Sequence, residues 1–245
     1  MSEIVITVPC YNEADRLQCE AFIEFVRQYR HVMFIFVDDG STDATGQLLR
    51  KMAEIEADNF RIISLEKNRG KAEAVRQGTL SAIAARTRYV GYWDADLATP
   101  LDAILDFVDQ LKRNSDLILV MGARIQLLGR TVIRKRSRHY LGRIFATFAS
   151  AVLRLPVYDT QCGAKLFVAS DPVALAFREP FISRWVFDVE ILARLVCRSN
   201  VNPHVAIYEH PLLKWQDVKG SKVKLKDFLV ALWDLGRIYF TYTRS

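Results

Sequence analysis

The sequence lacks the features that identify several common classes of protein. Its four cysteines form no CxxC pair and its four histidines form no HxxxH pair, which argues against a structural zinc site and fits a reducing compartment. Long hydrophobic runs are missing as well. The apolar stretch 144–153 is about half the ~20 residues that a spanning helix needs, so we expect no transmembrane segment. Glu3 and Asp15 interrupt the N-terminus, which argues against a signal peptide.

Several nucleotide-binding and hydrolase motifs are also missing. There is no GxGxxG or GxxxxGK[ST], which counts against a dinucleotide-binding dehydrogenase and a P-loop NTPase. There is no Gly-x-Ser-x-Gly, which counts against an α/β-hydrolase. What the 245 residues do have is 51% hydrophobic and 25% charged content, enough to bury one large core and too apolar for a disordered chain.

Acidic residues are absent from one long interval, between Asp116 and Asp159. The interval contains eight basic residues, and removing it changes the net charge from +6 to −2. An anionic partner is therefore expected to meet the protein there. We expect no nucleic-acid partner, because the interval has no interleaved aromatic residues and no recognisable nucleic-acid module.

The same interval carries an apolar stripe at helical spacing, formed by Leu141, Ile144, Phe145, Phe148 and Val152. Basic charge beside an apolar stripe favours contact with a membrane surface or with a phosphorylated substrate. The alternative is a helix that packs on the core and turns a basic face to solvent.

Apolar runs alternate with helical patterns, which predicts an α/β fold with a mixed, mostly parallel sheet flanked by helices. The sequence predicts strands at residues 4–9, 32–37, 61–65, 89–93 and 116–121. It predicts helices at residues 16–29, 45–57, 71–85, 186–198 and 225–242, and a basic amphipathic helix before Tyr158. In a doubly wound sheet of this kind, ligands bind outside the carboxyl ends of the strands.

No linker, repeat or low-complexity tract divides the chain, so we expect a single domain over residues 1–245. Within it we expect a nucleotide-binding half (1–100), an acceptor half (101–215) and a C-terminal amphipathic segment (216–245). Lysines precede the apolar face of that segment, as in helices that lie in a membrane interface. A helix that packs back on its own domain has the same pattern.

Carboxylates gather where two of the predicted strands end. Asp94 and Asp96 follow the fourth strand, and two such side chains can share a Mg²⁺ or Mn²⁺ ion with the phosphates of a substrate. Asp38 and Asp39 follow the second strand. Like charges crowded at one sheet edge are costly without a cation, which favours a metal site over a simple polar loop.

A basic group comes at the start of the helix predicted after the third strand, where Lys71 follows Arg69 and Gly70. The N–H groups of a helix start and a nearby lysine together bind anions. Carboxylates with a metal on one side and basic groups on the other predict a nucleoside diphosphate site.

Three motifs make the sequence resemble the family 2 glycosyltransferases of GT-A (Rossmann-like) fold: VPCYNE at 8–13, VDDGSTD at 37–43 and DAD at 94–96. Four more are similar to motifs of the dolichyl-phosphate and polyprenyl-phosphate β-glucosyltransferases: KNRGK at 67–71, DTQCGxKLF at 159–167, RWxFDVE at 184–190 and GSK at 220–222. The resemblance covers residues 4 to about 240, with its motifs in the same order.

This resemblance implies an enzyme that transfers a single hexose with inversion, glucose from UDP-glucose, to a polyprenyl or dolichyl phosphate, with Mg²⁺ or Mn²⁺ as cofactor. Single transfer is implied because Phe181 stands where processive relatives have the Gln of a QxxRW motif. The expected location is cytoplasmic and peripheral, on the cytoplasmic face of a membrane, in contact with its surface or with a separate membrane protein. A soluble or other lipid acceptor, and another donor such as GDP-mannose, stay open.

The resemblance also implies roles for individual residues. Those expected to bind the nucleotide sugar are Pro9, Tyr11, Glu13, Asp38, Asp39, Lys71, Asp94, Ala95 and Asp96, with Asp94 and Asp96 as metal ligands. Those expected to bind the acceptor phosphate are Arg124, Arg134, Arg136 and Arg138. Those expected to act in catalysis are Asp96, Arg124, Asp159, Gln161 and Asp188.

Two functions outside the family are alternatives. A sugar nucleotidyltransferase would carry a Gly-rich basic loop after its first strand, where this chain has residues 9–13. A membrane-binding module without enzymatic activity would leave Asp94, Asp96 and Lys71 unexplained. Asp188 also has a structural interpretation, as an acidic residue in the first turn of a helix.

Overall fold

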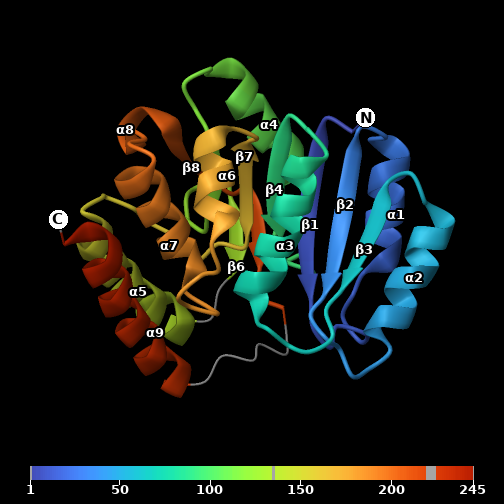
Figure 1. The fold of residues 1–245 in the computed structure, drawn as a ribbon, viewed down its shortest axis with the longest axis horizontal. Helices are drawn as coiled ribbons and strands as arrows, with labels where there is room; N and C mark the ends of the chain where they lie inside the picture. Colours follow the sequence, from blue (N-terminus) through green and yellow to red (C-terminus); the bar gives the residue numbers. More distant parts are fainter. Residues whose placement is uncertain (1, 134–135, 219–224, 245) are drawn as a thin grey trace.

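The computed structural model describes residues 2–133, 136–218 and 225–244, without the side chains of 136–139 and 225–228. A seven-stranded sheet forms its centre, in the order β3-β2-β1-β4-β7-β5-β8 (Figure 1). In chain order these strands are β1 (Ile4–Cys10), β2 (Val32–Asp38), β3 (Phe60–Ser64), β4 (Tyr89–Trp93), β5 (Leu119–Ala123), β7 (Ala164–Val168) and β8 (Ile207–Pro211).

Strand β7 is antiparallel to both of its neighbours, β4 and β5. The other neighbouring strands of this sheet are parallel. The register pairs Cys10 at the end of β1 with Asp38 at the end of β2. The loops that follow the parallel strands therefore meet at one edge of the sheet, which is where a ligand site is expected.

Helices cover both faces of the sheet (Figure 1). They are α1 (Cys19–Gln28), α2 (Thr45–Ile55), α3 (Lys71–Ala84), α4 (Ala103–Arg113), α5 (Arg136–Leu153), α6 (Asp171–Arg178), α7 (Phe187–Ala193), α8 (Pro203–Ala206) and α9 (Leu225–Ile238). Helices α7 and α9 continue into the π-helical turns η1 (Arg194–Arg198) and η2 (Tyr239–Thr243). Two short parallel strands, β6 (Thr131–Ile133) and β9 (Lys214–Gln216), form a second sheet.

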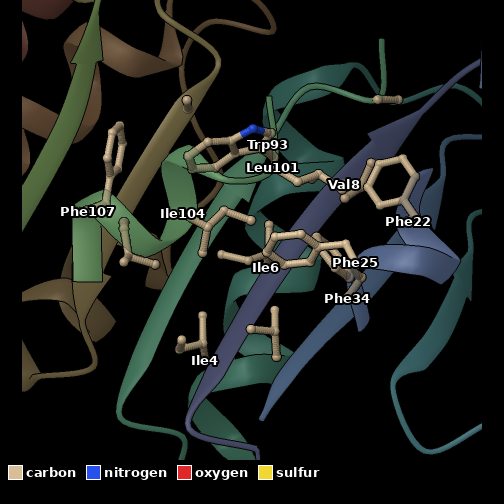
Figure 2. Packing of buried hydrophobic residues seen from close by; sticks show 14 of the residues in the cluster. Ile4, Ile6, Val8, Phe22, Phe25, Phe34, Trp93, Leu101, Ile104 and Phe107 are labelled. Atoms are coloured by element: carbon tan, nitrogen blue, oxygen red, sulfur yellow. The ribbon is translucent and has the colours of Figure 1, made fainter. Parts of the chain in front are cut away.

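Alternate residues of β1 pack into two different cores, because successive side chains of a strand point to opposite faces. Ile4 and Val8 join a cluster that includes Phe22 of α1 and Phe107 of α4 (Figure 2). Val5 joins the cluster on the other face, with residues of α3, α6 and α7. Burial on both faces explains why β1 is a nearly continuous apolar run.

The predicted α/β fold with a mixed, mostly parallel sheet is confirmed. The first four predicted strands match β1 to β4 within one residue at each end, and β5 begins three residues later than predicted. The segment at 158–167, which the sequence analysis left without an assigned structure, leads into the antiparallel strand β7.

Helices α5 and α9 pack side by side at one end of the molecule (Figure 1). Within the described ranges, no helix is both long enough and apolar enough to cross a membrane. Large apolar side chains are nevertheless exposed on both helices. We call them the α5–α9 apolar surface: Tyr140, Leu141, Ile144 and Phe148 of α5, with Leu229, Val230 and Trp233 of α9.

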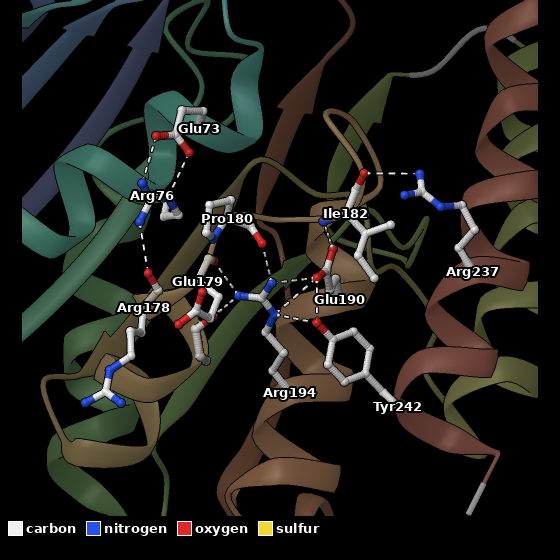
Figure 3. Close-up of polar contacts among 11 residues, drawn as sticks. Glu73, Arg76, Arg178, Glu179, Pro180, Ile182, Glu190, Arg194, Arg237 and Tyr242 are labelled. Carbon is white, nitrogen blue, oxygen red and sulfur yellow. Dashed lines mark hydrogen bonds and ion pairs between the residues drawn. The ribbon is translucent and has the colours of Figure 1, made fainter.

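A buried arginine joins the C-terminal turn to the connection between α6 and α7 (Figure 3). The guanidinium of Arg194 donates to Glu190 Oε1 at 2.7 Å and to three main-chain carbonyl oxygens within residues 176–180. The other oxygen of Glu190 accepts from the N–H of Ile182 at 2.8 Å, and Tyr242 donates to Oε1 at 2.9 Å. This cluster fixes residues 179–182, which come directly before the cleft-lining residues Arg184 and Trp185.

Candidate active site

A cleft of about 860 Å³ lies at the carboxyl edge of the parallel strands. The loops after β1, β3, β4 and β5 line it, together with the start of α3 and several residues of α5. Its position agrees with the place where open α/β sheets bind ligands.

Asp94 and Asp96 lie in this cleft directly after β4. The N–H of Asp94 donates to the carbonyl oxygen of Gly163 at 3.0 Å. A Cβ atom at residue 163 would come within 1.9 Å of Asp94 Oδ2, so the absence of a side chain there leaves room for the carboxylate. Asp94 Oδ1 lies 2.5 Å from Nζ of Lys71, the first residue of α3.

Burial and neighbouring charges decide the ionisation of these groups. Burial raises the pKa of Asp96, and the negative charge of Asp94 raises it further. Burial lowers the pKa of Lys71, but the charges of Asp94 and Asp188 outweigh burial and leave that pKa raised. Lys71 is therefore a cation at neutral pH, and additional positive charge near Asp94 and Asp96 would be stabilised.

The turn before α3 is fixed by Asp39. Its carboxylate accepts the N–H of Arg69 at 2.6 Å and the N–H of Gly70 at 2.8 Å. Gly70 has a φ of +97°, a conformation that favours glycine, and a Cβ there would come within 2.7 Å of Arg184 Nε. Burial raises the pKa of Asp39, although these two N–H groups oppose the shift. The turn thus places Lys71 against Asp94.

Glu13 is paired with an arginine. Nε of Arg16 lies 2.7 Å from Glu13 Oε2 and Nη2 lies 2.5 Å from Oε1. The N–H of Glu13 donates to Thr45 Oγ1 at 2.8 Å, which ties it to the start of α2. Two parallel charge-assisted bonds hold the Glu13 carboxylate in one orientation on the cleft wall.

Arg124 forms a similar two-bond pair with Asp159. Nε lies 2.6 Å from Asp159 Oδ2 and Nη2 lies 2.7 Å from Oδ1, and the guanidinium is 5.3 Å from the centre of the Trp215 ring. Burial lowers the pKa of Arg124, and the charge of Asp159 more than offsets this, so the pKa is raised. The pair is neutral overall, so Arg124 offers an incoming anion less charge than a lone arginine would.

Glu209 of β8 holds the loop that carries Asp159. Its carboxylate accepts the N–H of Asp159 at 2.8 Å and the N–H of Tyr158 at 2.9 and 3.0 Å. Burial raises the pKa of Glu209, although these N–H groups oppose the shift. Glu209 could not be selected from the sequence, because nothing in the local pattern places β8 beside this loop.

Asp188 is held by two donors at one oxygen. Its Oδ1 accepts from Tyr92 Oη at 2.5 Å and from Lys165 Nζ at 2.5 Å. Lys165 is fully buried and also donates to the carbonyl oxygens of Thr160 and Cys162. These two bonds hold the Asp188 carboxylate of α7 in a fixed position against Tyr92 of β4 and Lys165 of β7.

Gln161 and Cys162 have different surroundings in the next turn. Gln161 lines the cleft, and its Nε2 is buried without a hydrogen-bond partner in the described part of the chain. Such a donor is available to a ligand. Burial raises the pKa of Cys162 to about 11, so it is a neutral thiol near pH 7 and serves as a packing residue.

Two further arginines line the cleft, Arg143 and Arg184. Arg143 of α5 donates to the carbonyl oxygen of Tyr158 at 3.0 Å. Arg184 donates to Asn68 Oδ1 at 2.5 Å and to the carbonyl oxygen of Arg69 at 2.9 Å. Arg184 therefore bridges the 183–186 segment to the turn before α3.

The charges of the cleft bear on whether it could hold a metal. Among the described residues that line it, seven are acidic and five are basic, so a nucleoside diphosphate would add negative charge to a negative wall. No group of three His, Cys, Asp or Glu side chains within the described ranges could hold a metal alone. Mg²⁺ is commonly held by one or two carboxylates plus substrate phosphates, and Asp94 and Asp96 fit that arrangement.

Most of the residues selected from the sequence meet in this cleft. Those that line it are Pro9, Tyr11, Glu13, Asp39, Lys71, Asp94, Ala95, Asp96, Arg124, Asp159, Gln161 and Asp188. Asp38 is not among the lining residues: its Oδ1 accepts the N–H of Ser41 at 3.0 Å. Arg134 and the side chains of Arg136 and Arg138 lie outside the described residues. The roles assigned to all of these residues stay predictions.

Several residues that line the cleft were not expected from the sequence to belong to the site, among them Arg16, Arg143, Arg184 and Trp215. The contact of Arg16 with Glu13 could have been predicted, because the two residues have the i, i+3 spacing of an ion pair. Arg143 and Arg184 were visible as members of the basic interval and of the RWxFDVE motif. Trp215 had no signal, since its place depends on the pairing of β6 with β9.

The known proteins that are similar to this chain are glycosyltransferases. Residues 5–181 match the model of a family described as glycosyl transferase family 2. A dolichyl-phosphate beta-glucosyltransferase of Dictyostelium discoideum is 32% identical over 252 residues, an alignment that covers 97% of this chain and 74% of that protein. The protein of the same name from Saccharomyces cerevisiae is 32% identical over 241 residues, covering 90% and 69%.

Solved structures of low sequence identity have a similar fold. Glucosyl-3-phosphoglycerate synthase from Mycobacterium tuberculosis, in complex with UDP, superimposes with a TM-score of 0.68 at 19% identity, covering 98% of this chain and 80% of that one. The same enzyme in complex with Mn²⁺, UDP-glucose and glycerol 3-phosphate gives a TM-score of 0.65 at 17% identity, covering 98% and 79%.

Proposed function

Because the chain belongs to glycosyl transferase family 2 and is an enzyme of GT-A fold, we propose that it transfers one glucose, with inversion, from UDP-glucose to a polyprenyl or dolichyl phosphate. One observation carries the proposal: the cleft that contains Asp94 and Asp96 is also lined by Leu141, which belongs to the α5–α9 apolar surface. A polar donor and the phosphate end of an apolar acceptor can therefore meet. The names of the Dictyostelium and yeast relatives support the acceptor, and the bound UDP-glucose of the mycobacterial enzyme supports the donor.

On the donor side, we assign residues 1–100 to the nucleotide sugar, with Pro9, Tyr11, Glu13, Asp38, Asp39 and Ala95 around the nucleoside. Asp94 and Asp96 would hold Mg²⁺ or Mn²⁺ together with the diphosphate. When bound, this ion supplies positive charge that stabilises the departing UDP. Lys71 adds a fixed ammonium 2.5 Å from Asp94, where it can also contact the diphosphate.

The acceptor needs little activation, because a phosphate monoester is already ionised at neutral pH. One of its oxygens attacks the anomeric carbon from the face opposite UDP. The new carbon–oxygen bond forms as the bond to UDP breaks, and the bonding electrons leave with the β-phosphate oxygen. No proton has to be removed, so the chain supplies positioning and charge. Asp159, Gln161 and Asp188 are proposed to orient the sugar.

On the acceptor side, we assign residues 101–215 to binding the acceptor and residues 216–245, with α5, to the membrane interface. The exposed side chains of the α5–α9 apolar surface support this assignment, since contiguous apolar patches mark interaction sites. The excess of basic residues between Asp116 and Asp159 supports an anionic membrane, the cytoplasmic leaflet in particular.

The proposal is tested by incubating the protein with radiolabelled UDP-glucose, a polyprenyl phosphate and Mn²⁺, and counting the label extracted into organic solvent. We expect label in the organic phase with the wild-type chain and none above background with Asp96→Ala. Asp58→Ala, an exposed aspartate in the turn after α2, is the matched control and should keep full activity.

Other results would identify the alternatives. Label that stays in a neutral aqueous product would indicate a soluble acceptor. Organic-phase label from GDP-mannose but not from UDP-glucose would indicate a different donor. A wild-type chain that neither binds UDP in calorimetry nor transfers sugar from either donor would contradict the proposed nucleotide site.

A further inference from the structure

The five basic side chains among the described residues of the cleft differ in what they contact. Three are paired with carboxylates of the cleft wall at 2.5–2.7 Å, namely Arg16, Lys71 and Arg124. Arg184 donates to the turn before α3. Arg143 has no carboxylate within 4.0 Å in the described part of the chain, so its charge is not neutralised by a side chain there.

The guanidinium of Arg143 is nevertheless held in a defined orientation. Its Nη1 donates to the carbonyl oxygen of Tyr158 at 3.0 Å, and its centre lies 3.9 Å from the centre of the Tyr158 ring. A guanidinium has five N–H groups, and this bond uses one of them. Arg143 is therefore oriented before a ligand arrives, which reduces the entropy lost on binding.

The neighbours of Arg143 on α5 are apolar. Leu141, Phe145 and Ala146 line the cleft beside it, and Ile144 and Phe148 are exposed on the α5–α9 apolar surface. A fixed cation among hydrocarbon side chains matches a ligand that joins a phosphate to an apolar chain. It matches a nucleoside diphosphate poorly, since the proposed site for that group lies around Asp94, Asp96 and Lys71.

We infer that Arg143 binds the phosphate of the prenyl phosphate acceptor and holds it for attack, with Ile144 and Phe148 contacting the first part of the hydrocarbon chain. This inference rests on the proposed function. The phosphate carries a charge of about −1.5 to −2 near neutral pH, and a guanidinium can contact two of its oxygens at once. Arg124 is less suited to this contact, because Asp159 already accepts from two of its nitrogens and balances its charge.

The test compares Arg143→Gln and Arg143→Lys with Arg154→Gln, a matched control at an exposed arginine directly after α5. Two acceptors are used, a long polyprenyl phosphate in detergent and a short, water-soluble prenyl phosphate. We expect Arg143→Gln to raise the KM of both acceptors by about tenfold to a hundredfold, the effect of losing a bond between charged groups. The KM of UDP-glucose should not change. Arg143→Lys should raise the acceptor KM by an intermediate amount, because lysine keeps the positive charge but lacks the paired N–H donors of a guanidinium.

Each other outcome overturns the inference. An unchanged acceptor KM in Arg143→Gln would show that the phosphate binds elsewhere. A rise in the UDP-glucose KM without a rise in the acceptor KM would assign Arg143 to the donor. An effect on the long acceptor alone would mean that Arg143 contributes to lipid or detergent contact and not to the phosphate.

Binding measurements separate this inference from the proposed function. If the wild-type chain transfers no glucose, the proposed function fails, but calorimetry can still measure binding of the short prenyl phosphate in the presence of UDP and Mn²⁺. Weaker binding by Arg143→Gln than by the wild type would then support the role of Arg143. Equal affinity, or no binding by the wild type, would overturn it.

Discussion

At the scale of single residues, the cleft is built from ion pairs, and only part of this could be predicted from the sequence. Asp94, Asp96 and Lys71 could be selected because each lies at the end of a strand or the start of a helix, where ligands bind. The pairing of Arg124 with Asp159 could not be predicted, because it joins residues 35 positions apart through the adjacency of β5 and β7.

Asp96→Asn is expected to stabilise the protein in metal-free buffer. The raised pKa of Asp96 means that its charged form is less favourable in the folded chain than in the unfolded one, so removing the charge should raise the Tm. A change of about 1 kcal/mol moves the Tm of a chain of this size by about 2–4 °C. The N–H of Ala98 keeps an acceptor, because the asparagine retains Oδ1.

The pH dependence of this effect has a definite sign. As the pH falls through the raised pKa, wild-type Asp96 takes up a proton and becomes neutral, so the difference in Tm between the two proteins should shrink. Thermal unfolding with a chelator, at several pH values, measures it. Mn²⁺ added in the presence of UDP should raise the Tm of the wild type and not of Asp96→Asn. A variant that melts lower than the wild type near pH 7 would contradict the argument.

At the scale of helices and strands, hydrophobic periodicity was enough to predict β1 to β4. Strands β1, β2 and β4 are buried almost throughout and therefore read as apolar runs. Strand β3 lies at the edge of the sheet with only Phe60 buried, but Ile62 and Ile63 still give it an apolar centre. Periodicity was not enough to predict β7, because the residue pattern of a five-residue strand does not depend on whether the strand runs parallel or antiparallel to its neighbours. It was also not enough for β6, β8 and β9, whose exposed or half-buried residues give no apolar run.

Glu209→Gln tests whether β8 positions the loop that carries Asp159 and Gln161. The amide would keep one oxygen acceptor but turn an NH₂ group toward the N–H of Tyr158 or Asp159. We expect kcat to fall about tenfold or more, with the KM of UDP-glucose within twofold of the wild type, because Asp159 and Gln161 of this loop are proposed to orient the sugar. Glu54→Gln on the exposed face of α2 is the control. A normal kcat would mean that Asp159 is positioned without Glu209.

Arg194→Met tests the buried cluster of Figure 3. Removing the guanidinium leaves the Glu190 carboxylate buried without its partner, which costs about 3–5 kcal/mol in the free energy of unfolding. The double change Arg194→Met with Glu190→Gln should cost less than the single one. Arg27→Met breaks a pair whose arginine is 54% exposed, and should cost about 1 kcal/mol or less. Urea unfolding measures all three, and equal losses for Arg194→Met and Arg27→Met would refute the prediction.

At the scale of the whole molecule, α5 and α9, the two helices that carry the exposed residues of the α5–α9 apolar surface, lie together at one end, away from β1 to β3 (Figure 1). The sequence analysis described each helix as amphipathic but could not place the two side by side, because that contact depends on how the chain returns after β8. Both helices also reach the cleft, which is lined by Leu141, Phe145 and Ala146 of α5 and by Ala231 of α9.

Binding to vesicles should depend on this surface. We expect the wild-type chain to co-sediment with anionic phospholipid vesicles, and the double change Phe148→Ser with Trp233→Ser to reduce the bound fraction severalfold. Added salt should weaken the binding of both, since basic residues contribute to it. Ile55→Ser, an exposed apolar residue of α2, is the control and should bind as the wild type does. Equal binding by the double variant would rule out this surface.

The place of β7 in the sheet has a consequence for how the chain is synthesised. Tyr89 of β4 pairs with Val168 of β7, so the edge of β4 stays open while the intervening residues are being translated. Strands β5 and β8 join the sheet only through β7. Chains stopped at residue 158 are therefore expected to sediment as aggregates, because an open strand edge invites pairing with other chains. Soluble monomers of that length would show that the first four strands are protected in some other way.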